Sequence, residues 1–276
     1  MVCKEIKPAY LLCIKDDDDI VYNNMLYYYN IGIRDYYIML HCANEETVAQ
    51  INLFSQKHPI AQVKTFIDND YIYKKDIHFQ NLSQNAYGDG CNWHIATDTD
   101  EILILRKDNT IHDFLQKYKN HESLLFDWYN YKKTRCNPDD ENIFLSWINR
   151  DILPSKWTKA ISQWTHKQIW AAGQHFLINS NGYKITNDIA YYAHFPYRNF
   201  ERWAKRRIDF AKTKYERFKN EKNREEWLKL ARYYEIKEND NFLLSLWNSV
   251  MCNIENSTTI EKDPIDKNKF KDTNRL

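Results

Sequence analysis

The chain of 276 residues is long enough for one large domain or for a domain with an appendage, and its hydrophobic share of 43% is ordinary for a globular protein. A formal net charge of +1 excludes a strong field that would attract nucleic acid, and six scattered cysteines without a CxxC pair argue against a zinc site or a disulfide framework. No stretch approaches the roughly 18 apolar residues that span a bilayer, and residues 1–15 show no signal-peptide pattern, so we expect a cytoplasmic protein, free or at the inner face of a membrane.

Short apolar strands alternate with amphipathic helices over the first hundred residues. Apolar runs predict strands at residues 9–14, 36–40, 61–67 and 92–97, and helical spacing predicts helices at residues 20–30, 45–57 and 76–86. This alternation predicts right-handed βαβ units. We therefore expect an α/β fold with a mainly parallel, Rossmann-like sheet and helices on both faces.

The second half of the chain is more mixed. Its patterns predict a helix at residues 111–118, a strand at 123–129, a helix at 138–149 and a hairpin at 176–194 with its turn at 179–182. From residue 200 to about residue 253 the chain is charged and helical in pattern, and after residue 255 it is polar with few apolar residues. We therefore expect an α/β domain over residues 1–198, a helical C-terminal region over 199–254 and a disordered tail over 255–276.

Two aspartates stand at the junction of two apolar runs. Asp98 and Asp100 are two positions apart, so an extended backbone would place both carboxylates on one side and turn Glu101 to the other. Paired carboxylates suit Mg²⁺ or Mn²⁺, above all when substrate phosphates complete the coordination. An acidic turn between two strands is the alternative, because short motifs often occur by chance.

Polar residues follow the end of each expected strand in the first half. These are Lys15 and Asp16, the loop at residues 41–44, the loop at 68–70 and the motif at 98–101. In a parallel sheet the carboxyl ends of the strands meet at one edge, where ligands bind. The chain contains neither a dinucleotide-binding nor a P-loop glycine motif, so a metal and cationic side chains would have to hold any phosphate.

The order of these features resembles that of the GT-A-fold glycosyltransferases, specifically the bacterial family-2-like group close to the family-92 galactosyltransferases. The matching pieces are Lys15-Asp16, Trp93 with Asp98-Thr99-Asp100-Glu101, Lys159, Gly173-Gln174-His175, and the run from His194 through Arg198 and Phe200 to Lys205. They span residues 10–205. Two places depart from the pattern: Lys15-Asp16-Asp17 stands where such enzymes usually have Lys-Asn-Glu, and His41 to Asn44 stands where an acidic residue is frequent.

The resemblance implies a catalytic domain over residues 1–198 that transfers a sugar from a nucleotide donor to a hydroxyl of a glycan or glycolipid acceptor, in bacterial surface polysaccharide or lipooligosaccharide synthesis. A Mn²⁺ or Mg²⁺ ion held by Asp98 and Asp100 would neutralise the charge of the leaving diphosphate, and His194 or His175 would complete its ligands. The residues that would contact the nucleotide are Lys15, Asp16, Asn44, Asp98, Lys159 and Arg198. Arg198 and Lys159 would act as phosphate clamps.

An inverting transfer needs a base that removes the acceptor proton. We favour Asp188, a few residues before His194, with Glu141 or Asp140 as alternatives. The latter two stand at a predicted helix start, where acidic residues are common for structural reasons alone.

The basic helical region after residue 199 could rest on anionic lipid as a peripheral membrane contact, through Trp203, Phe210, Phe218 and Trp227. Alternatively, it packs these aromatic side chains on the catalytic domain or on another subunit. Two other functions fit the same motifs: a nucleotidyltransferase with the same paired carboxylates, and a non-catalytic glycan-binding module on a degenerate GT-A fold. The sequence does not determine the donor sugar, the acceptor, the linkage or the oligomeric state.

Overall fold

The computed structural model describes residues 5–70, 74–132, 142–165, 168–196, 198, 200–205, 208, 244–245, 247–249 and 259–272. The strands are β1 (Pro8–Ile14), β2 (Asp35–His41), β3 (Gln62–Asp68), β4 (Trp93–Thr97), β5 (Glu101–Leu105), β6 (Ser123–Lys132), β7 (Asn149–Asp151), β8 (Thr158–Gln163), β9 (Tyr183–Lys184), β10 (Ala190–His194) and β11 (Ile260–Lys262). The helices are α1 (Val21–Asn30), α2 (Glu45–Lys57), α3 (Lys75–Gly88), α4 (Ile111–Lys117) and α5 (Ile143–Ser146), with short 3₁₀ turns η1 (Ala172–Gln174) and η3 (Lys267–Phe270).

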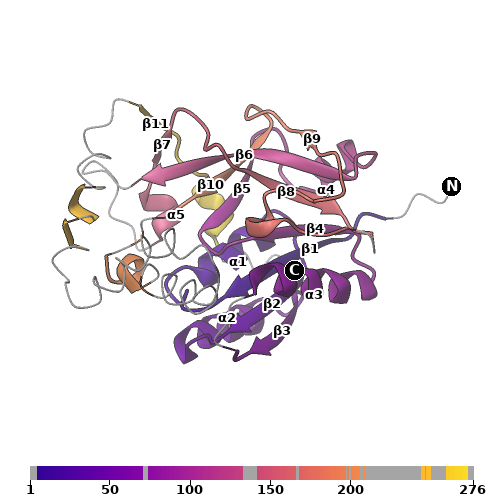
Figure 1. Ribbon diagram of the computed structural model, residues 1–276, viewed down its shortest axis with the longest axis horizontal. Coiled ribbons are helices and arrows are strands. Elements are labelled where there is room, and N and C mark those ends of the chain that lie inside the picture. Colours follow the sequence, from indigo (N-terminus) through magenta and orange to yellow (C-terminus); the bar gives the residue numbers. More distant parts are fainter. Residues whose placement is uncertain are drawn as a thin grey trace, which may run out of the picture.

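One large sheet organises the molecule (Figure 1). Its strand order is β11-β7-β6-β8-β4-β1-β2-β3, and β5, β9 and β10 pair beside this path. The strands β4, β1, β2 and β3 are parallel, which confirms the α/β fold with a parallel core. Beyond β4 the neighbours β8, β6 and β7 pair antiparallel, so the sheet as a whole is mixed.

Helices cover both faces of the parallel core, as predicted. Along β1 the side chains alternate between two hydrophobic clusters because successive residues of a strand point to opposite faces. Tyr10, Leu12 and Ile14 belong to the cluster that includes α1 and α2. Ala9 and Leu11 belong to the cluster that includes α3. The strand is therefore buried on both sides, and its polar continuation at residue 15 emerges at the carboxyl edge of the sheet.

The predicted hairpin at residues 176–194 is wrong. β9 pairs parallel with β6, and β10 lies between β5 and β6. A two-residue Asn-Gly hairpin turn needs a positive φ at glycine, and Gly182 is not among the residues with positive φ. Its role is steric: a Cβ at Gly182 would lie 2.3 Å from Cγ of Leu125. The glycine therefore lets the backbone pass close over β6.

The predicted helix at residues 138–149 is also wrong at its end. Only α5 is helical there, and Asn149 begins β7. The first part of that prediction, residues 138–141, lies outside the described residues. An apolar segment as short as this one has no periodicity long enough to separate a helical turn from a strand.

The prediction of a disordered tail is wrong for residues 259–272. β11 pairs antiparallel with β7, and η3 places Phe270 against Tyr27 and Phe144, with ring centroids 5.3 Å and 5.6 Å apart. Asp272 accepts a hydrogen bond from Tyr22. We call residues 259–272 the C-terminal strap. The strap has no hydrophobic core of its own, because ion pairs and a few apolar contacts attach it to the rest of the protein. Its composition is therefore as polar as that of a disordered tail.

Most of the region at 199–254, including Phe210, Phe218 and Trp227, lies outside the described residues. Residues 200–205 are helical, and Trp203, considered either as a lipid contact or as a packed side chain, is buried against Phe200 and Trp247. Within the part of the chain that the structure describes, no helix has the length and apolar character needed to cross a bilayer.

Candidate functional site

Two carboxylates and an imidazole converge where β4 turns into β5. His194, the last residue of β10, is paired with Glu101 at the start of β5. The backbone N–H of Phe195 donates to the carbonyl of Asp100 at 2.8 Å, which fixes the two segments together. One ligand atom each of Asp100, Glu101 and His194 lies within 4.8 Å of the others. We call these three residues the acidic cluster.

The acidic cluster offers the kind of donor atoms that Mn²⁺ accepts. Asp100 and Glu101 are almost fully buried, and Nε2 of His194 lies 3.9 Å from a carboxylate oxygen of Asp100. Nδ1–H of His194 donates to the side-chain oxygen of Asn130 at 2.8 Å. That contact fixes the ring and directs Nε2 towards Asp100, so Nε2 is the nitrogen that would bind a metal. The residues therefore fit the divalent ion that the sequence resemblance implies.

Glu101 was expected to face away from Asp100, and the structure shows why it does not. Residues 98–100 form a turn in which the N–H of Glu101 donates to the carbonyl of Asp98 at 3.1 Å. The alternation that holds in an extended strand does not apply across a turn. The same turn separates Asp98 from the acidic cluster.

The carboxylate of Asp98 contacts two lysine side chains and is not part of the acidic cluster. Its carboxylate pairs with Nζ of Lys75 and lies 3.7 Å from Nζ of Lys159. Burial by itself would raise the pKa of Asp98, but the two lysines outweigh it and hold this pKa well below its usual range. Asp98 is therefore an ionised carboxylate that positions two lysines at the edge of the site.

Lys159 is a buried ammonium group in direct contact with the acidic cluster. Its Nζ lies 2.8 Å from Glu101 and donates to the carbonyl of Gly173 at 2.9 Å. Burial lowers the pKa of Lys159, but Glu101, Asp98 and Asp100 together raise it above the usual lysine value. Burial likewise raises the pKa of Glu101, and Lys159 opposes that shift. Lys159 thus compensates the negative charge of this site. Its ammonium group contacts Glu101 and the carbonyl of Gly173, which are groups of the protein itself.

His175 lies outside the acidic cluster. Its Nδ1–H donates to the carbonyl of Thr158 at 2.7 Å, and its ring stacks on Trp157 with centroids 4.9 Å apart and an interplanar angle of 22°. Of the two histidines predicted as alternative metal ligands, the structure places His194 beside Asp100. Trp128, which the sequence reading missed, lies between them, 4.3 Å from the His194 ring and 6.0 Å from the His175 ring. Its role depends on the pairing of β6 with β10, for which the sequence carries no local signal.

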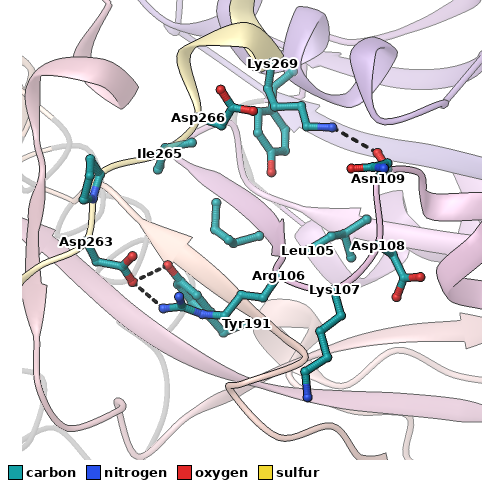
Figure 2. Close-up of a pocket in the computed structure, with 13 residues that line it drawn as sticks. Leu105, Arg106, Lys107, Asp108, Asn109, Tyr191, Asp263, Ile265, Asp266 and Lys269 are labelled. Carbon is teal, nitrogen blue, oxygen red and sulfur yellow. Dashed lines mark hydrogen bonds and ion pairs between the residues drawn. The ribbon is translucent and has the colours of Figure 1, made fainter.

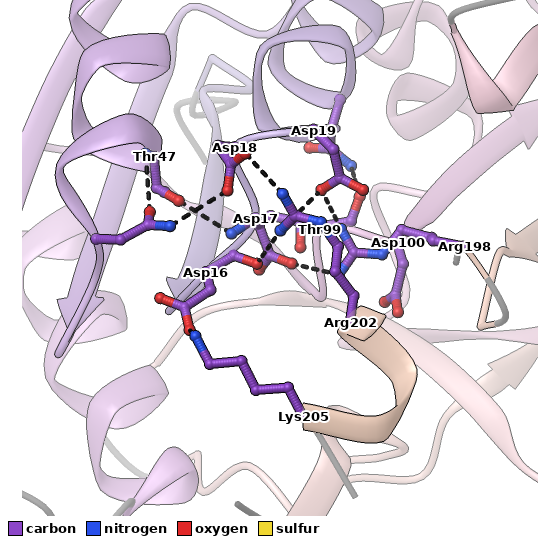
Figure 3. A network of polar contacts seen from close by, with 12 residues as sticks. Asp16, Asp17, Asp18, Asp19, Thr47, Thr99, Asp100, Arg198, Arg202 and Lys205 are labelled. Atoms are coloured by element: carbon purple, nitrogen blue, oxygen red, sulfur yellow. Dashed lines mark hydrogen bonds and ion pairs between the residues drawn. The ribbon is translucent and has the colours of Figure 1, made fainter. Parts of the chain in front are cut away.

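Arg198, expected as a phosphate clamp, follows β10, and its side chain is buried against the loop that follows β1. Its two terminal nitrogens donate to Asp17 at 2.5 Å and to Asp19 at 2.6 Å (Figure 3). The guanidinium therefore has carboxylates at the position where a diphosphate would bind it. Asp100 lies beside this network in the same view.

The loop after β1 holds two further cations from the same helical segment. Arg202 donates to Asp18 at 2.6 Å and to the carbonyl of Asp16 at 2.8 Å, and Lys205 donates to Asp16 at 2.5 Å. Asn44 donates to Asp18 at 3.3 Å, while its side-chain oxygen caps α2. Lys15, which opens this loop, is partly buried. The predicted gathering of strand-end residues is thus observed for Asp16 and Asn44, and Arg198, Arg202 and Lys205 join them from the segment after β10.

The structure does not bring the favoured base to the acidic cluster. Asp188 is exposed and pairs with Lys107 at 2.5 Å, near the end of β5. β10 runs from Ala190, opposite Leu105, to His194, opposite Glu101, so Asp188 lies beyond the far end of the strand. The four steps of β10 from Ala190 to His194 span about 13 Å, and residues 187–189 form a turn before the strand. This position does not support Asp188 as the base. Glu141 and Asp140 lie outside the described residues.

A second group of metal-binding residue types stands at the ends of β2 and β3. Nε2–H of His78 donates to Asp68 at 2.6 Å, and His41 lies 3.9 Å from the same carboxylate. These three residues also have ligand atoms within 4.8 Å of one another. The pKa of His41 is lowered by burial and by His78, so this imidazole is neutral at pH 7.

A cavity of about 340 Å³ lies elsewhere, between the end of β5 and the C-terminal strap (Figure 2). Asp263 of the strap accepts hydrogen bonds from Arg106 at 2.6 Å and Tyr191 at 2.7 Å at its wall. Lys269 donates to the carbonyl of Asn109 at 3.0 Å. The polar groups at this cavity therefore bind the strap to the sheet, at the end of β5 opposite to Asp100.

No protein-family model matches the chain, and a search of curated proteins finds no match. Among solved structures it is similar to the mannosyltransferase PcManGT from Pyrobaculum calidifontis in complex with GDP-Man and Mn²⁺. The two share 9% identity over 91% of this chain and 76% of that chain, with a TM-score of 0.43. This similarity is too low to transfer a fold or a function, so the chemistry proposed below depends on the residues of this chain.

Proposed function

We propose that the chain is a metal-dependent glycosyltransferase that moves a sugar from a nucleotide donor to a hydroxyl of a glycan or glycolipid acceptor. The observation that carries this proposal is the acidic cluster of Asp100, Glu101 and His194, situated beside the carboxyl ends of the parallel strands. This edge is where ligands bind in parallel α/β sheets. The sequence resemblance to GT-A enzymes supports the same function.

Asp100, Glu101 and His194 would hold Mn²⁺ or Mg²⁺. The ion would supply Lewis-acid stabilisation of the diphosphate that leaves as the glycosidic bond breaks. Asn130 orients His194 by accepting its Nδ1–H. Lys159 keeps a positive charge beside Glu101 and Asp98, which lowers the repulsion that a diphosphate would meet here.

Arg198, which lies against the loop after β1, would bind the phosphates of the donor. Arg198 is held by Asp17 and Asp19 in this structure, so a diphosphate would compete with these carboxylates for the guanidinium. Lys15 and Asp16 would contact the nucleoside. We further propose, from the sequence resemblance, an inverting transfer in bacterial surface-glycan synthesis at the cytoplasmic face of the membrane; the base for it stays a prediction.

The test is metal-dependent nucleotide binding. We expect a nucleoside diphosphate or nucleotide sugar to raise the melting temperature only when Mn²⁺ is present, because a ligand that binds the folded state stabilises it by mass action. Asp100→Asn should abolish this shift, measured across a panel of nucleotide sugars. Asp113→Asn, an exposed carboxylate on α4, is the matched control and should keep it.

Product analysis separates the alternatives. A glycosyltransferase releases a nucleoside mono- or diphosphate, whereas release of pyrophosphate would identify a nucleotidyltransferase. A binding module would show no Mn²⁺-dependent shift in the wild type and no difference between Asp100→Asn and Asp113→Asn.

A further inference from the structure

An exposed indole is connected to the acidic cluster through two further aromatic rings. Trp157, in the loop between β7 and β8, keeps 47% of its surface exposed. Tryptophan is enriched at binding surfaces because its ring is apolar while its N–H is polar. One side of the Trp157 ring is held by the His175 ring, stacked at 4.9 Å with an interplanar angle of 22°.

Aromatic rings connect this surface to the acidic cluster without a break. The His175 ring lies 6.0 Å from Trp128, and Trp128 lies 4.3 Å from His194. His194 in turn lies 3.9 Å from the carboxylate of Asp100. Trp157, His175 and Trp128, here called the aromatic path, therefore lead from solvent to the residues that would hold the donor.

The His175 ring of the aromatic path is held in place by its own loop before any ligand arrives. His175 and Thr158 are joined by two hydrogen bonds, from Nδ1–H to the Thr158 carbonyl at 2.7 Å and from the Thr158 hydroxyl to the His175 carbonyl at 3.0 Å. Gly173 has a φ of +75°, and a Cβ there would lie 2.5 Å from Nε2 of His175. Glycine at this position therefore leaves room for the ring to lie against the loop in this orientation. A preset surface binds with a smaller loss of conformational entropy.

We propose that Trp157 and His175 form the acceptor subsite of this enzyme and that the acceptor is a carbohydrate whose ring stacks on the indole. This inference rests on the proposed function. A sugar ring presents C–H groups on its faces and hydroxyl groups at its rim, and the negative face of an indole attracts the positively polarised C–H groups. Nζ of Lys156 lies over the Trp157 ring, 5.3 Å from its centroid, and would donate to hydroxyl groups of a sugar that stacks on this ring. Trp128 lies between this subsite and the acidic cluster.

The experiment is saturation-transfer NMR with methyl α- and β-glycosides of glucose, galactose and mannose, on the full chain without nucleotide. We expect transfer to the ring C–H protons of at least one glycoside, weakened roughly three- to tenfold by Trp157→Ala and retained by Trp157→Phe. Tyr183→Ala is the control, because Tyr183 is also exposed and stacked on a histidine, His121, at 4.1 Å. It should bind like the wild type.

Three results would overturn the subsite: no transfer to any glycoside, equal transfer in the wild type and Trp157→Ala, or full binding by Trp157→Leu. The last would indicate an apolar contact, such as a lipid chain, in place of ring stacking. Mn²⁺-dependent nucleotide binding should be the same in Trp157→Ala and the wild type. If the wild type binds glycosides but no nucleotide, the proposed function fails while the carbohydrate surface stands, so the two failures are distinguishable.

Discussion

Lys159 and Glu101 form an ion pair in which both side chains are 2% exposed or less. Removing two charges from water costs several kcal/mol, and only good geometry with additional hydrogen bonds offsets that cost. Here the lysine also contacts Asp98 and the carbonyl of Gly173, while Glu101 accepts the backbone N–H of Asp98 at 3.1 Å. The pair therefore holds the turn at residues 98–101 in shape, whatever ligand the site takes.

Lys159→Met should destabilise the protein strongly, because it leaves the Glu101 carboxylate buried beside Asp100 without its cation. We expect a loss of about 3–5 kcal/mol in the free energy of unfolding at pH 7, measured by urea denaturation. The double variant with Glu101→Gln should recover much of this loss. Additive effects of the two substitutions would contradict the coupling.

At the scale of elements, a tight loop after β8 presents the His175 ring. Two successive residues, Gly173 and Gln174, have positive φ values of +75° and +56°. Such backbone conformations are costly for residues other than glycine and persist where the surroundings impose them. The loop is held by the contact from Lys159 to the Gly173 carbonyl and by the two hydrogen bonds between His175 and Thr158.

Gly173→Ala should strain this loop and displace His175, because its Cβ would meet the imidazole at 2.5 Å. We expect a loss of about 1–3 kcal/mol in unfolding free energy, together with weaker glycoside binding. Gly88→Ala at the end of α3 is the control, since its φ is ordinary and the new Cβ would have no described atom within 4 Å. That control should leave the stability unchanged or raise it slightly. Equal effects of the two substitutions would show that the Gly173 loop is not strained.

At the scale of the whole molecule, the C-terminal strap joins parts of the chain that are distant in sequence. Asp263 accepts hydrogen bonds from Arg106 of the β5 end and Arg150 of β7, and Asp272 accepts one from Tyr22 of α1.

The global stability also depends on histidines buried in their neutral form. His94 is fully buried, stacks on Trp164 with ring centroids 5.2 Å apart, and its Nε2 lies 3.3 Å from the carbonyl of Cys91.

Burial lowers the pKa of His94 to about 3, well below the unfolded value of 6.5. Because the unfolded state binds the proton more tightly, stability is fully present above pH 6.5 and falls as the pH drops from there towards 3. Between pH 7 and pH 5 we expect His94 to account for about 2 kcal/mol of lost unfolding free energy. His94→Phe, which keeps an aromatic ring beside Trp164, should flatten this part of the pH profile measured by urea denaturation.

The lowered pKa values of His41 and His58 should leave a smaller slope in His94→Phe. A pH profile identical to that of the wild type would contradict the assignment to His94.

The sequence by itself determined the parallel half of the sheet. The strands β1 to β4 and the helices between them follow from apolar runs and helical spacing, which are local properties. The convergence of Asp16, Asn44 and Asp98 at one edge follows as well, because parallel strands align their carboxyl ends. Asp100 was identified from the spacing of the two aspartates and His194 from the family resemblance, and the two lie together in the structure.

Only the tertiary structure decided which side chains meet. The turn at residues 98–101 brings Glu101 to Asp100 and sends Asp98 to Lys75, although a strand pattern predicts the reverse. Trp128 reaches His194 because β6 pairs with β10, and the polar strap is ordered by partners over a hundred residues away. Local periodicity reports the conformation of a segment and the face it buries. Contacts between segments depend on strand register and on charge pairing, which are established only when the chain is folded.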